Sequence, residues 1–219
     1  MDAKATVQIG SFDRGGKNRV PTVAADHDFT PKARVTPYGI FLPQLDELFL
    51  YLTQSKVTSD FIIDRLEEFW QSQRQRFPHV QTLVLNQDNG PENHSRRTQF
   101  MKRIVEFSHK YKLNIRLAYY PPYHSKYNPI ERVWAILENH WNGSILDEIE
   151  TALRYASSMT WKGKAPVVQL VTTSYETGVK LTKKAMNLIE NQIERLTNLT
   201  QENLPDLGRW FVDISCSTI

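Results

Sequence analysis

The sequence predicts an α/β fold, in which a sheet built from short strands is flanked by helices. Short apolar runs typical of strands occur throughout the first 120 residues, and segments of helical periodicity separate them after residue 58. The composition is ordinary for a globular protein, with 40% apolar and 23% charged residues. A chain of 219 residues is long enough for one such domain, or one domain with an appendage, around a substantial core.

The first part of the chain is predicted to supply three strands. Residues 1–9 are predicted to form a strand, because small or apolar side chains alternate with polar ones from Ala3 to Ile9. Residues 11–37 contain two adjacent glycines and three prolines and are predicted to form a long loop or arm. The apolar segments 39–42 and 48–53 are joined by a short polar connection, so we expect an antiparallel pair.

The middle of the chain alternates helix and strand. A helix is predicted over residues 59–76, capped by Thr58 or the serine that follows it, and a strand over residues 80–87 comes next. A second helix over residues 94–112 precedes a strand over 115–120. The exposed side of that second helix is expected to be basic, through Arg96, Arg97, Lys102, Arg103 and Lys110.

The end of the chain is predicted to be mainly helical. Helical periodicity recurs over residues 145–159 and 178–197. We therefore expect one α/β domain over residues 1–143, with a mainly helical carboxyl-terminal extension over residues 144–219 packed on it.

Asp88 lies where the predicted strand of residues 80–87 ends. Residues 82–85 suggest a buried strand, because β-branched and aliphatic residues follow one another, and the Asn-Gly-Pro after Asp88 stops it. A carboxylate at the carboxyl end of a central strand lies where open α/β sheets place their ligand crevices. Asp88 is therefore a candidate for chemistry, and an Asx turn with the Asn-Gly that follows is the alternative.

A second acidic motif begins a helix. Asn128 is predicted as the N-cap of this helix, with Pro129 at its first position. Glu131 at the third position lies at the edge of the apolar stripe. The spacing alone fits a functional carboxylate and a capping-box glutamate bonded to the Asn128 amide equally well. The stripe consists of Ile130, Val133, Trp134, Leu137 and Trp141.

Together these two motifs resemble a known family. Asp-Asn-Gly-Pro-Glu-Asn at residues 88–93 and Tyr-Tyr-Pro-Pro-Tyr-His-Ser-Lys-Tyr-Asn-Pro-Ile-Glu-Arg-Val-Trp at residues 119–134 are similar to the second and third acidic blocks of DDE transposases of bacterial insertion sequences, in the broad mariner-like set. The amino-acid sequence of residues 2–7 and 25–29 is most similar to that of the ISAzo-type group. The two acidic residues have 42 residues between them, with a predicted helix and strand, as in that family. The resemblance covers essentially the whole chain.

The resemblance implies an RNase H-like catalytic domain over residues 1–143, whose mixed sheet is flanked by helices. It implies that Asp2 on the first strand joins Asp88 and Glu131 as catalytic and metal-binding carboxylates. Two Mg²⁺ or Mn²⁺ ions about 3.5–4 Å apart can activate a water or 3′-hydroxyl and stabilise the leaving oxygen in DNA strand cleavage and transfer. Hard divalent cations prefer oxygen ligands, which the three carboxylates supply.

Four further residues are candidates for contacts to DNA or around the metal-binding carboxylates: Asn89, His124, Lys126 and Arg132. The alternative for the two cations, Lys126 and Arg132, is a surface position without a functional role. Asp26-His27-Asp28 also has metal-ligating side chains, but three consecutive residues do not easily converge on one ion. We expect that segment to fix its loop instead.

Composition limits the partners and the compartment. The single cysteine, Cys216, excludes an intramolecular disulfide framework and a cysteine-rich zinc site. The sequence contains neither a signal peptide nor a run of 18 apolar residues, so we expect a cytoplasmic protein without a membrane partner. From Glu92 to Arg132 nine Lys or Arg residues stand against three Glu, which predicts attraction for phosphates. The expected partners are the DNA ends of the insertion sequence and its target DNA, and a homodimer is compatible with the sequence.

Three functions compete at this point. The first is a metal-dependent transposase, which needs Asp2 within about 5–8 Å of Asp88 and Glu131, the range over which carboxylates can share two metal ions. The second is an inactive relic that binds DNA without specificity, which a frayed Asp2 would favour. The family carries a helix-turn-helix region ahead of its catalytic domain, so the resemblance also implies an amino-terminally truncated chain. The third is a glycoside hydrolase with Asp88 and Glu131 as acid and base, for which the basic segment has no use.

Overall fold

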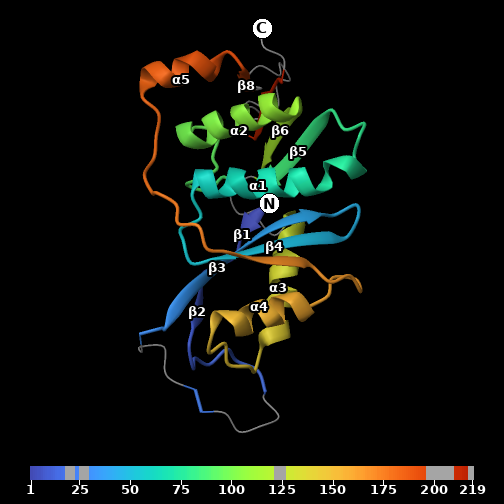
Figure 1. Ribbon diagram of the computed structural model, residues 1–219, viewed down its shortest axis with the longest axis vertical. Coiled ribbons are helices and arrows are strands. Elements are labelled where there is room, and N and C mark those ends of the chain that lie inside the picture. The colour runs from blue at the N-terminus through green and yellow to red at the C-terminus, as the bar shows by residue number, and fades with distance from the viewer. Residues whose placement is uncertain (18–22, 25–29, 121–126, 196–209, 217–219) are drawn as a thin grey trace. The chain divides into compact units, whose positions relative to one another are not determined.

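The computed structural model describes residues 1–17, 23–24, 30–120, 127–195 and 210–216 (Figure 1). The chain forms two compact units, and each unit is assembled from two separate chain segments. Unit 1 comprises residues 1–57 and 129–174, and unit 2 comprises residues 58–128 and 175–219.

The sheet of unit 1 is mixed and is built around one long strand. This central strand, β3 (Ala33–Leu42), pairs antiparallel with the two short strands β1 (Asp2–Ala3) and β2 (Val7–Ile9). On its other edge β3 pairs antiparallel with β4 (Glu47–Thr53). Parallel to β4 runs β7 (Val167–Val171), which comes from a distant part of the chain.

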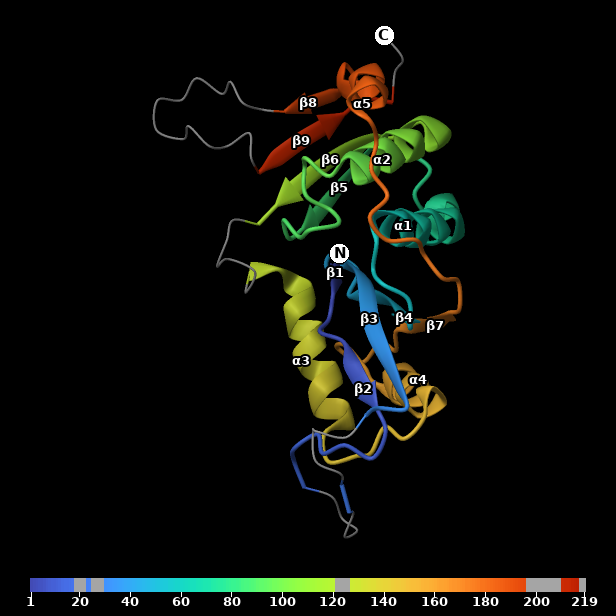
Figure 2. The ribbon, with the colours of Figure 1, turned by 90° about the vertical axis from the view of Figure 1, so that its left-hand side faces the viewer.

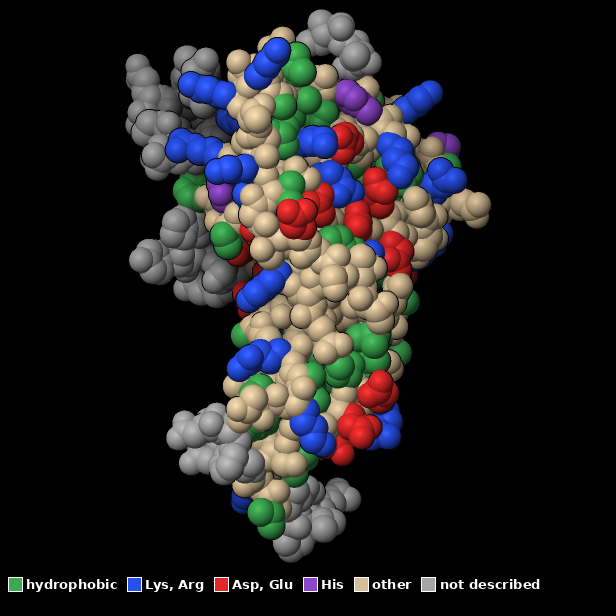
Figure 3. All heavy atoms as spheres, turned by 60° about the vertical axis from the view of Figure 1, so that its left-hand side comes forward, with side chains coloured by type: hydrophobic (Ala, Val, Ile, Leu, Met, Phe, Trp, Pro, Cys, Tyr) green, Lys and Arg blue, Asp and Glu red, His purple; other side chains and the backbone are tan. Residues whose placement is uncertain are grey.

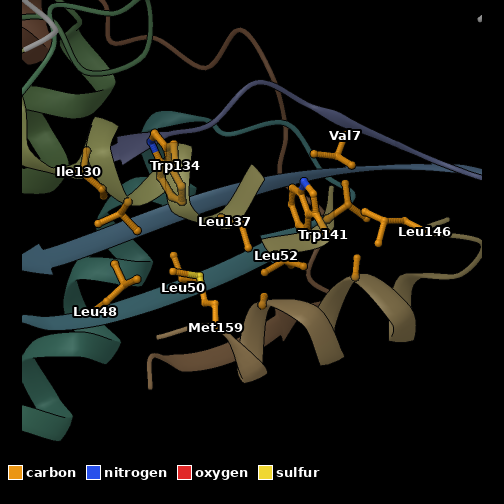
Figure 4. Packing of buried hydrophobic residues seen from close by; sticks show 14 of the residues in the cluster. Val7, Leu48, Leu50, Leu52, Ile130, Trp134, Leu137, Trp141, Leu146 and Met159 are labelled. Atoms are coloured by element: carbon orange, nitrogen blue, oxygen red, sulfur yellow. The ribbon is translucent and has the colours of Figure 1, made fainter. Parts of the chain in front are cut away.

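Two helices complete unit 1, namely α3 (Pro129–Trp141) and α4 (Ile149–Ser158). The apolar stripe of α3 is buried, with Val133, Leu137 and Trp141 at 0% exposure. Figure 4 shows the side chains of α3 beside those of β4, in one apolar cluster that also includes residues of α4. Burying a side chain of this size stabilises the folded state by about 1.5–3 kcal/mol. The helix–sheet contact is therefore a major source of stability in unit 1.

Gly39 permits the closest contact between α3 and β3. A Cβ atom at this position would lie 2.7 Å from Cδ1 of Ile130 and 2.8 Å from the Cη2 atom of Trp134. Real Cβ atoms essentially never approach other heavy atoms so closely. A glycine inside a strand often marks such a close approach. The start of α3 can therefore pack directly on the backbone of β3.

Unit 2 contains the helices α1 (Ser59–Gln73), α2 (Thr98–Tyr111) and α5 (Lys183–Glu190), with the 3₁₀ turn η1 (Arg74–Arg76) after α1. Its sheet has the order β5-β6-β9-β8, which can be followed in Figure 2. The strands are β5 (Thr82–Gln87), β6 (Asn114–Tyr119), β8 (Ile193–Arg195) and β9 (Phe211–Ile214). Parallel β5 and β6 are connected through α2, whereas β9 is antiparallel to both of its neighbours.

The helices α1 and α2 pack on each other through apolar faces and ionic contacts. The N-cap predicted for α1 is confirmed, because the Thr58 hydroxyl accepts a hydrogen bond from the Phe61 amide at 3.3 Å. Between the helices the Arg103 guanidinium contacts Asp60 at 2.5 Å and Asp64 at 2.7 Å. Both helices also carry fully buried apolar side chains: Phe61, Ile63, Leu66, Phe100, Ile104 and Phe107.

The predicted α/β class is confirmed, and so is the order of elements through α3. Strands at the start are followed by α1, β5, α2, β6 and α3, as the periodicity indicated. The start of α3 at Pro129 and its buried stripe also agree with the prediction. No helix in the described part of the chain is long and apolar enough to cross a membrane.

Several expectations about the strands are wrong. The strand expected over residues 1–9 is broken into β1 and β2, which both pair with β3. The loop or arm expected over residues 11–37 ends earlier, because β3 begins at Ala33. The strands form two mixed sheets where one was expected. In addition, β5 is not buried on both faces, since Thr82 and Val84 are exposed.

The carboxyl-terminal part differs most from the prediction. Of the helix expected over residues 178–197 only α5 is found, and β8 follows it. The strands β7 and β9 were not anticipated, because each is short and pairs with a strand far away in the sequence. The helix expected over residues 145–159 is confirmed as α4. The expected division at residue 143 stays a prediction.

The close approach at Gly39 predicts a clear effect on stability. We expect Gly39→Ala to lower the free energy of unfolding by about 1–3 kcal/mol, because the added methyl group forces Ile130 and the rigid Trp134 ring to move. Urea unfolding followed by tryptophan fluorescence measures the change. The control is Arg34→Ala at an exposed position of the same strand, which should stay within about 0.5 kcal/mol of the parent. An alanine variant at position 39 as stable as the parent would show that the contact is not tight.

Candidate functional site

Asp88 directly follows the last residue of β5. Its neighbour Gln87 is fully buried and pairs with Tyr119 of β6 in the sheet register. The pairing continues for one more bond, because the Tyr120 amide donates to the Gln87 carbonyl at 3.0 Å. Asp88 itself is half-buried. The carboxylate therefore stands at the carboxyl end of a parallel strand pair, and its predicted position at a strand end is confirmed. The strand is not the central one that was expected, because β5 lies at the edge of the described sheet.

After Asp88 the chain turns sharply over Gly90. The amides of Asn93 and His94 donate to the Gly90 carbonyl at 3.4 and 3.1 Å. Within this turn the side-chain amide of Asn93 donates to Oδ1 of Asp88 at 3.0 Å. A Cβ atom on Gly90 would lie 3.0 Å from Oδ1 of Asn93 and 3.1 Å from Oδ2 of Asp88. The glycine leaves room for the carboxylate and the amide to meet.

Buried polar groups of the two strands hold the far end of the turn. The Tyr119 hydroxyl donates to the Asn93 carbonyl at 2.8 Å, and Nε2 of Gln87 approaches the same oxygen at 3.5 Å. Burial raises the pKa of the Tyr119 hydroxyl well above its usual value, so this group stays a protonated donor at physiological pH. Oε1 of Gln87 is buried without a hydrogen-bond partner among the described residues. These contacts tie the turn after β5 to β6.

The segment between this turn and α2 is held by Glu92. Its carboxylate contacts Arg97 at 3.0 Å and accepts a hydrogen bond from the Ser59 amide at 3.1 Å. The segment therefore stays outside the helix, and α2 begins at Thr98 instead of near residue 94 as predicted. Burial, and then the positive charges of Arg97 and Arg96, lower the pKa of His94, which favours its neutral form.

Asp2 is part of the sheet of unit 1 and pairs with Gly39. Oδ1 of Asp2 accepts a hydrogen bond from the Ala3 amide at 2.8 Å. Met1 before it is buried at 9% exposure. Residues 1–3 are therefore not frayed, because Asp2 and Ala3 pair with β3. Fraying of this segment would have favoured the relic hypothesis.

Glu131 lies in the first turn of α3 and is half-buried. Its neighbour Ile130 packs against Gly39, the residue that pairs with Asp2. Asp2 and Glu131 therefore belong to the same end of unit 1. Asp88 belongs to unit 2, so the three carboxylates come from both units of the chain.

The other predicted site residues have different outcomes. Asn89 and Arg132 are exposed, as contacts to a ligand require. His124 and Lys126 lie outside the described residues, as does the segment Asp26-His27-Asp28. Their predicted roles remain predictions.

The basic character expected of α2 is partly neutralised by ion pairs within unit 2. Arg97 pairs with Glu92, Arg103 with two aspartates of α1, and Lys110 with Glu67. Figure 3 shows carboxylates in red among the blue Lys and Arg side chains on this part of the surface. The sequence count therefore overstated the positive potential that α2 offers to phosphates.

The structure adds three residues that the sequence did not identify. They are Gly39 below the start of α3, Asn93 at the Asp88 carboxylate and Tyr119 at the Asn93 carbonyl. Gly39 had a recognisable signal, since a glycine within an apolar strand indicates close packing. Asn93 and Tyr119 lie within the two acidic motifs, but the motifs alone give neither residue a role. No group of three or more His, Cys, Asp or Glu residues that could hold a metal ion occurs within the described residues.

The protein is thus an α/β protein with mixed sheets. One candidate carboxylate, Asp88, lies at a strand end, and another, Glu131, lies in the first turn of a helix. A family profile described as a Rhodopirellula transposase DDE domain matches residues 1–215. The chain therefore belongs to this family of insertion-sequence DDE transposases. Neither a curated protein nor a solved structure matches it.

Proposed function

We propose that the chain catalyses divalent-metal-dependent DNA strand cleavage and strand transfer at the ends of an insertion sequence. Asp2, Asp88 and Glu131 are the proposed ligands of two Mg²⁺ or Mn²⁺ ions. The observation that carries the proposal is the family match over residues 1–215, which includes both acidic motifs. Membership in a transposase family favours this function over a glycoside hydrolase.

The donor set fits the proposed ions. All three side chains are carboxylates, the oxygen donors that Mg²⁺ and Mn²⁺ prefer. Asp88 and Glu131 are half-buried, so each keeps surface that is accessible to a ligand. A pair of bound divalent ions would activate the attacking water or 3′-hydroxyl and stabilise the leaving oxygen.

The elements that carry the carboxylates suit this role. Asp88 follows a strand whose last residue is buried and paired, and Glu131 stands on a helix whose neighbouring side chains are buried. Ligands on rigid elements lose little conformational freedom when they bind an ion. Asn89 and Arg132, both exposed, are the proposed contacts to DNA next to these two carboxylates, and His124 and Lys126 join them in the proposal.

The first test removes the carboxylates one at a time. We expect Asp2→Asn, Asp88→Asn and Glu131→Gln each to reduce Mn²⁺-dependent nicking of supercoiled plasmid by more than about 100-fold, a larger loss than residues outside the ligand set cause. The same variants should fail to join a labelled duplex with a free 3′-hydroxyl to a target plasmid. Gel assays at saturating Mn²⁺ measure both reactions.

The matched control is Glu176→Gln, which removes one exposed carboxylate in unit 2 without touching the motifs. It should nick as the parent does. If Asp88→Asn kept parental, metal-dependent nicking, the proposed ligand set would be wrong. A parent chain that binds DNA but does not nick it in Mg²⁺ or Mn²⁺ would instead support the inactive relic.

A groove in unit 1 supports DNA as the partner. Three exposed cations line it, namely Lys32, Arg34 and Lys56, together with the hydroxyl groups of Thr6 and Thr36. Its described lining includes no carboxylate, although Lys32 also lies within electrostatic range of Asp147 outside the groove. Lysine, arginine and hydroxyl side chains are the usual partners of DNA phosphates.

We therefore expect DNA binding that is weak, salt-dependent and only slightly selective for sequence. Neutralising the groove with Lys32→Gln, Arg34→Gln and Lys56→Gln should reduce the slope of log K against log salt by up to about 0.9 for each DNA phosphate that the protein no longer neutralises. Fluorescence anisotropy with two unrelated duplexes of equal length measures it.

The control for the groove variant is Arg74→Gln, Arg76→Gln and Lys112→Gln, which removes the same charge from exposed positions of unit 2. Its salt slope should match that of the parent. Equal effects of the two triple variants would mean that net charge alone attracts DNA. If the chain preferred one duplex and kept that preference at high salt concentration, binding through phosphates would be contradicted.

A further inference from the structure

We propose that Asn93 is a positioning residue for the Asp88 carboxylate, holding Oδ1 so that Oδ2 is presented to a divalent metal ion. The inference rests on the proposed function, because it concerns how one of the proposed ligands is oriented. Asn93 is the last residue of the motif at residues 88–93, and no role for it follows from the family resemblance or from the metal chemistry.

The contact between the two side chains is direct. The Asn93 amide donates to Oδ1 of Asp88 at 3.0 Å, a normal distance for an N–H···O hydrogen bond. Asn93 is buried at 8% exposure, whereas Asp88 is half-buried. Oδ2 of Asp88 has no hydrogen-bond donor among the described residues. Among the described residues, one carboxylate oxygen thus accepts a hydrogen bond and the other remains available to a ligand.

The position of the Asn93 side chain is itself fixed through its backbone. The Tyr119 hydroxyl and the Gln87 amide both approach the Asn93 carbonyl oxygen, at 2.8 and 3.5 Å. Tyr119 is 4% exposed and Gln87 is fully buried, so the two anchors belong to the core of unit 2. Since these bonds use the main chain of Asn93, changing its side chain leaves them in place.

An amide suits this position better than the alternatives. It donates a hydrogen bond without adding charge, so the carboxylate keeps the full negative charge that attracts a cation. A lysine or arginine here would compete with the metal ion for the carboxylate. A hydrogen bond from a neighbouring group to a ligating side chain orients that ligand, and its loss typically costs 10–100-fold in metal affinity.

The experiment compares Mn²⁺ binding by three variants of the full chain. Asn93→Ala removes the donor, and Asn93→Asp replaces it by an acceptor of the same shape that repels Asp88. Tyr119→Phe keeps the Asn93 side chain but removes the hydroxyl that anchors its carbonyl. Titration of the electron paramagnetic resonance signal of free Mn²⁺ measures affinity without requiring activity. Nicking as a function of Mn²⁺ concentration gives the half-saturating concentration.

We expect Asn93→Ala to weaken Mn²⁺ binding and to raise the half-saturating Mn²⁺ concentration about 10–100-fold, with much of the nicking rate restored at saturating Mn²⁺. Asn93→Asp should weaken binding at least as strongly, and Tyr119→Phe should weaken it less. The control is Asn187→Ala, an exposed asparagine of unit 2, which should bind Mn²⁺ as the parent does. A thermal melt of each variant separates loss of metal affinity from loss of folding.

The outcomes distinguish this inference from the proposed function. If Asp88→Asn weakens Mn²⁺ binding and abolishes nicking while folded Asn93→Ala and Asn93→Asp match the parent, the positioning role is wrong and the ligand role of Asp88 stands. If Asp88→Asn leaves Mn²⁺ binding and nicking unchanged, both are wrong. A loss of nicking in Asn93→Ala that saturating Mn²⁺ does not restore, with parental Mn²⁺ affinity, would also overturn the inference.

Discussion

The burial of one face of α3 against the sheet is the interaction on which unit 1 depends. Strands alone would leave the apolar side chains of β3 and β4 exposed, and α3 covers them with two tryptophans and aliphatic residues. The contact is close because Gly39 has no side chain. It determines more than stability: the first turn of α3 carries Glu131, so the same packing fixes where that carboxylate stands. Gly39, which has no side chain, thus helps to determine the position of the Glu131 carboxylate.

Unit 2 holds its acidic residue by a different physical means. Asp88 lies in a turn, where apolar packing cannot fix a side chain, and the turn is held instead by hydrogen bonds to buried polar groups of β5 and β6. Such bonds contribute little net stability, but leaving a buried partner unsatisfied is costly. They therefore select one conformation of the turn over others. Unit 1 thus positions its carboxylate through apolar packing, and unit 2 positions its carboxylate through hydrogen bonds.

The sequence predicted those parts of the structure that are specified locally. The Thr58 cap, the Pro129 start of α3 and the apolar stripes of the helices depend on neighbours within a few residues. The strands β7 and β9 depend on partners far along the chain, and short segments such as Ile193–Arg195 of β8 have no pattern of their own. The start of α2 was placed too early because the Glu92 contact with Ser59 cannot be read from spacing. For the candidate site, the sequence identified the carboxylates but not the uncharged residues that position them.

The interleaving of the two units has a consequence for how the chain folds. Unit 1 needs residues 1–57 and 129–174, and unit 2 needs residues 58–128 and 175–219, so neither is a continuous piece of the chain. The parallel pairing of β4 with β7 joins residues more than 100 positions apart, and the antiparallel pairing of β6 with β9 spans nearly as many. Pairings of such long sequence separation carry a large loop-closure entropy and form slowly. On a ribosome, β4 and β6 would both emerge well before the strands that complete their sheets, and for that interval they would expose unpaired edges to other chains.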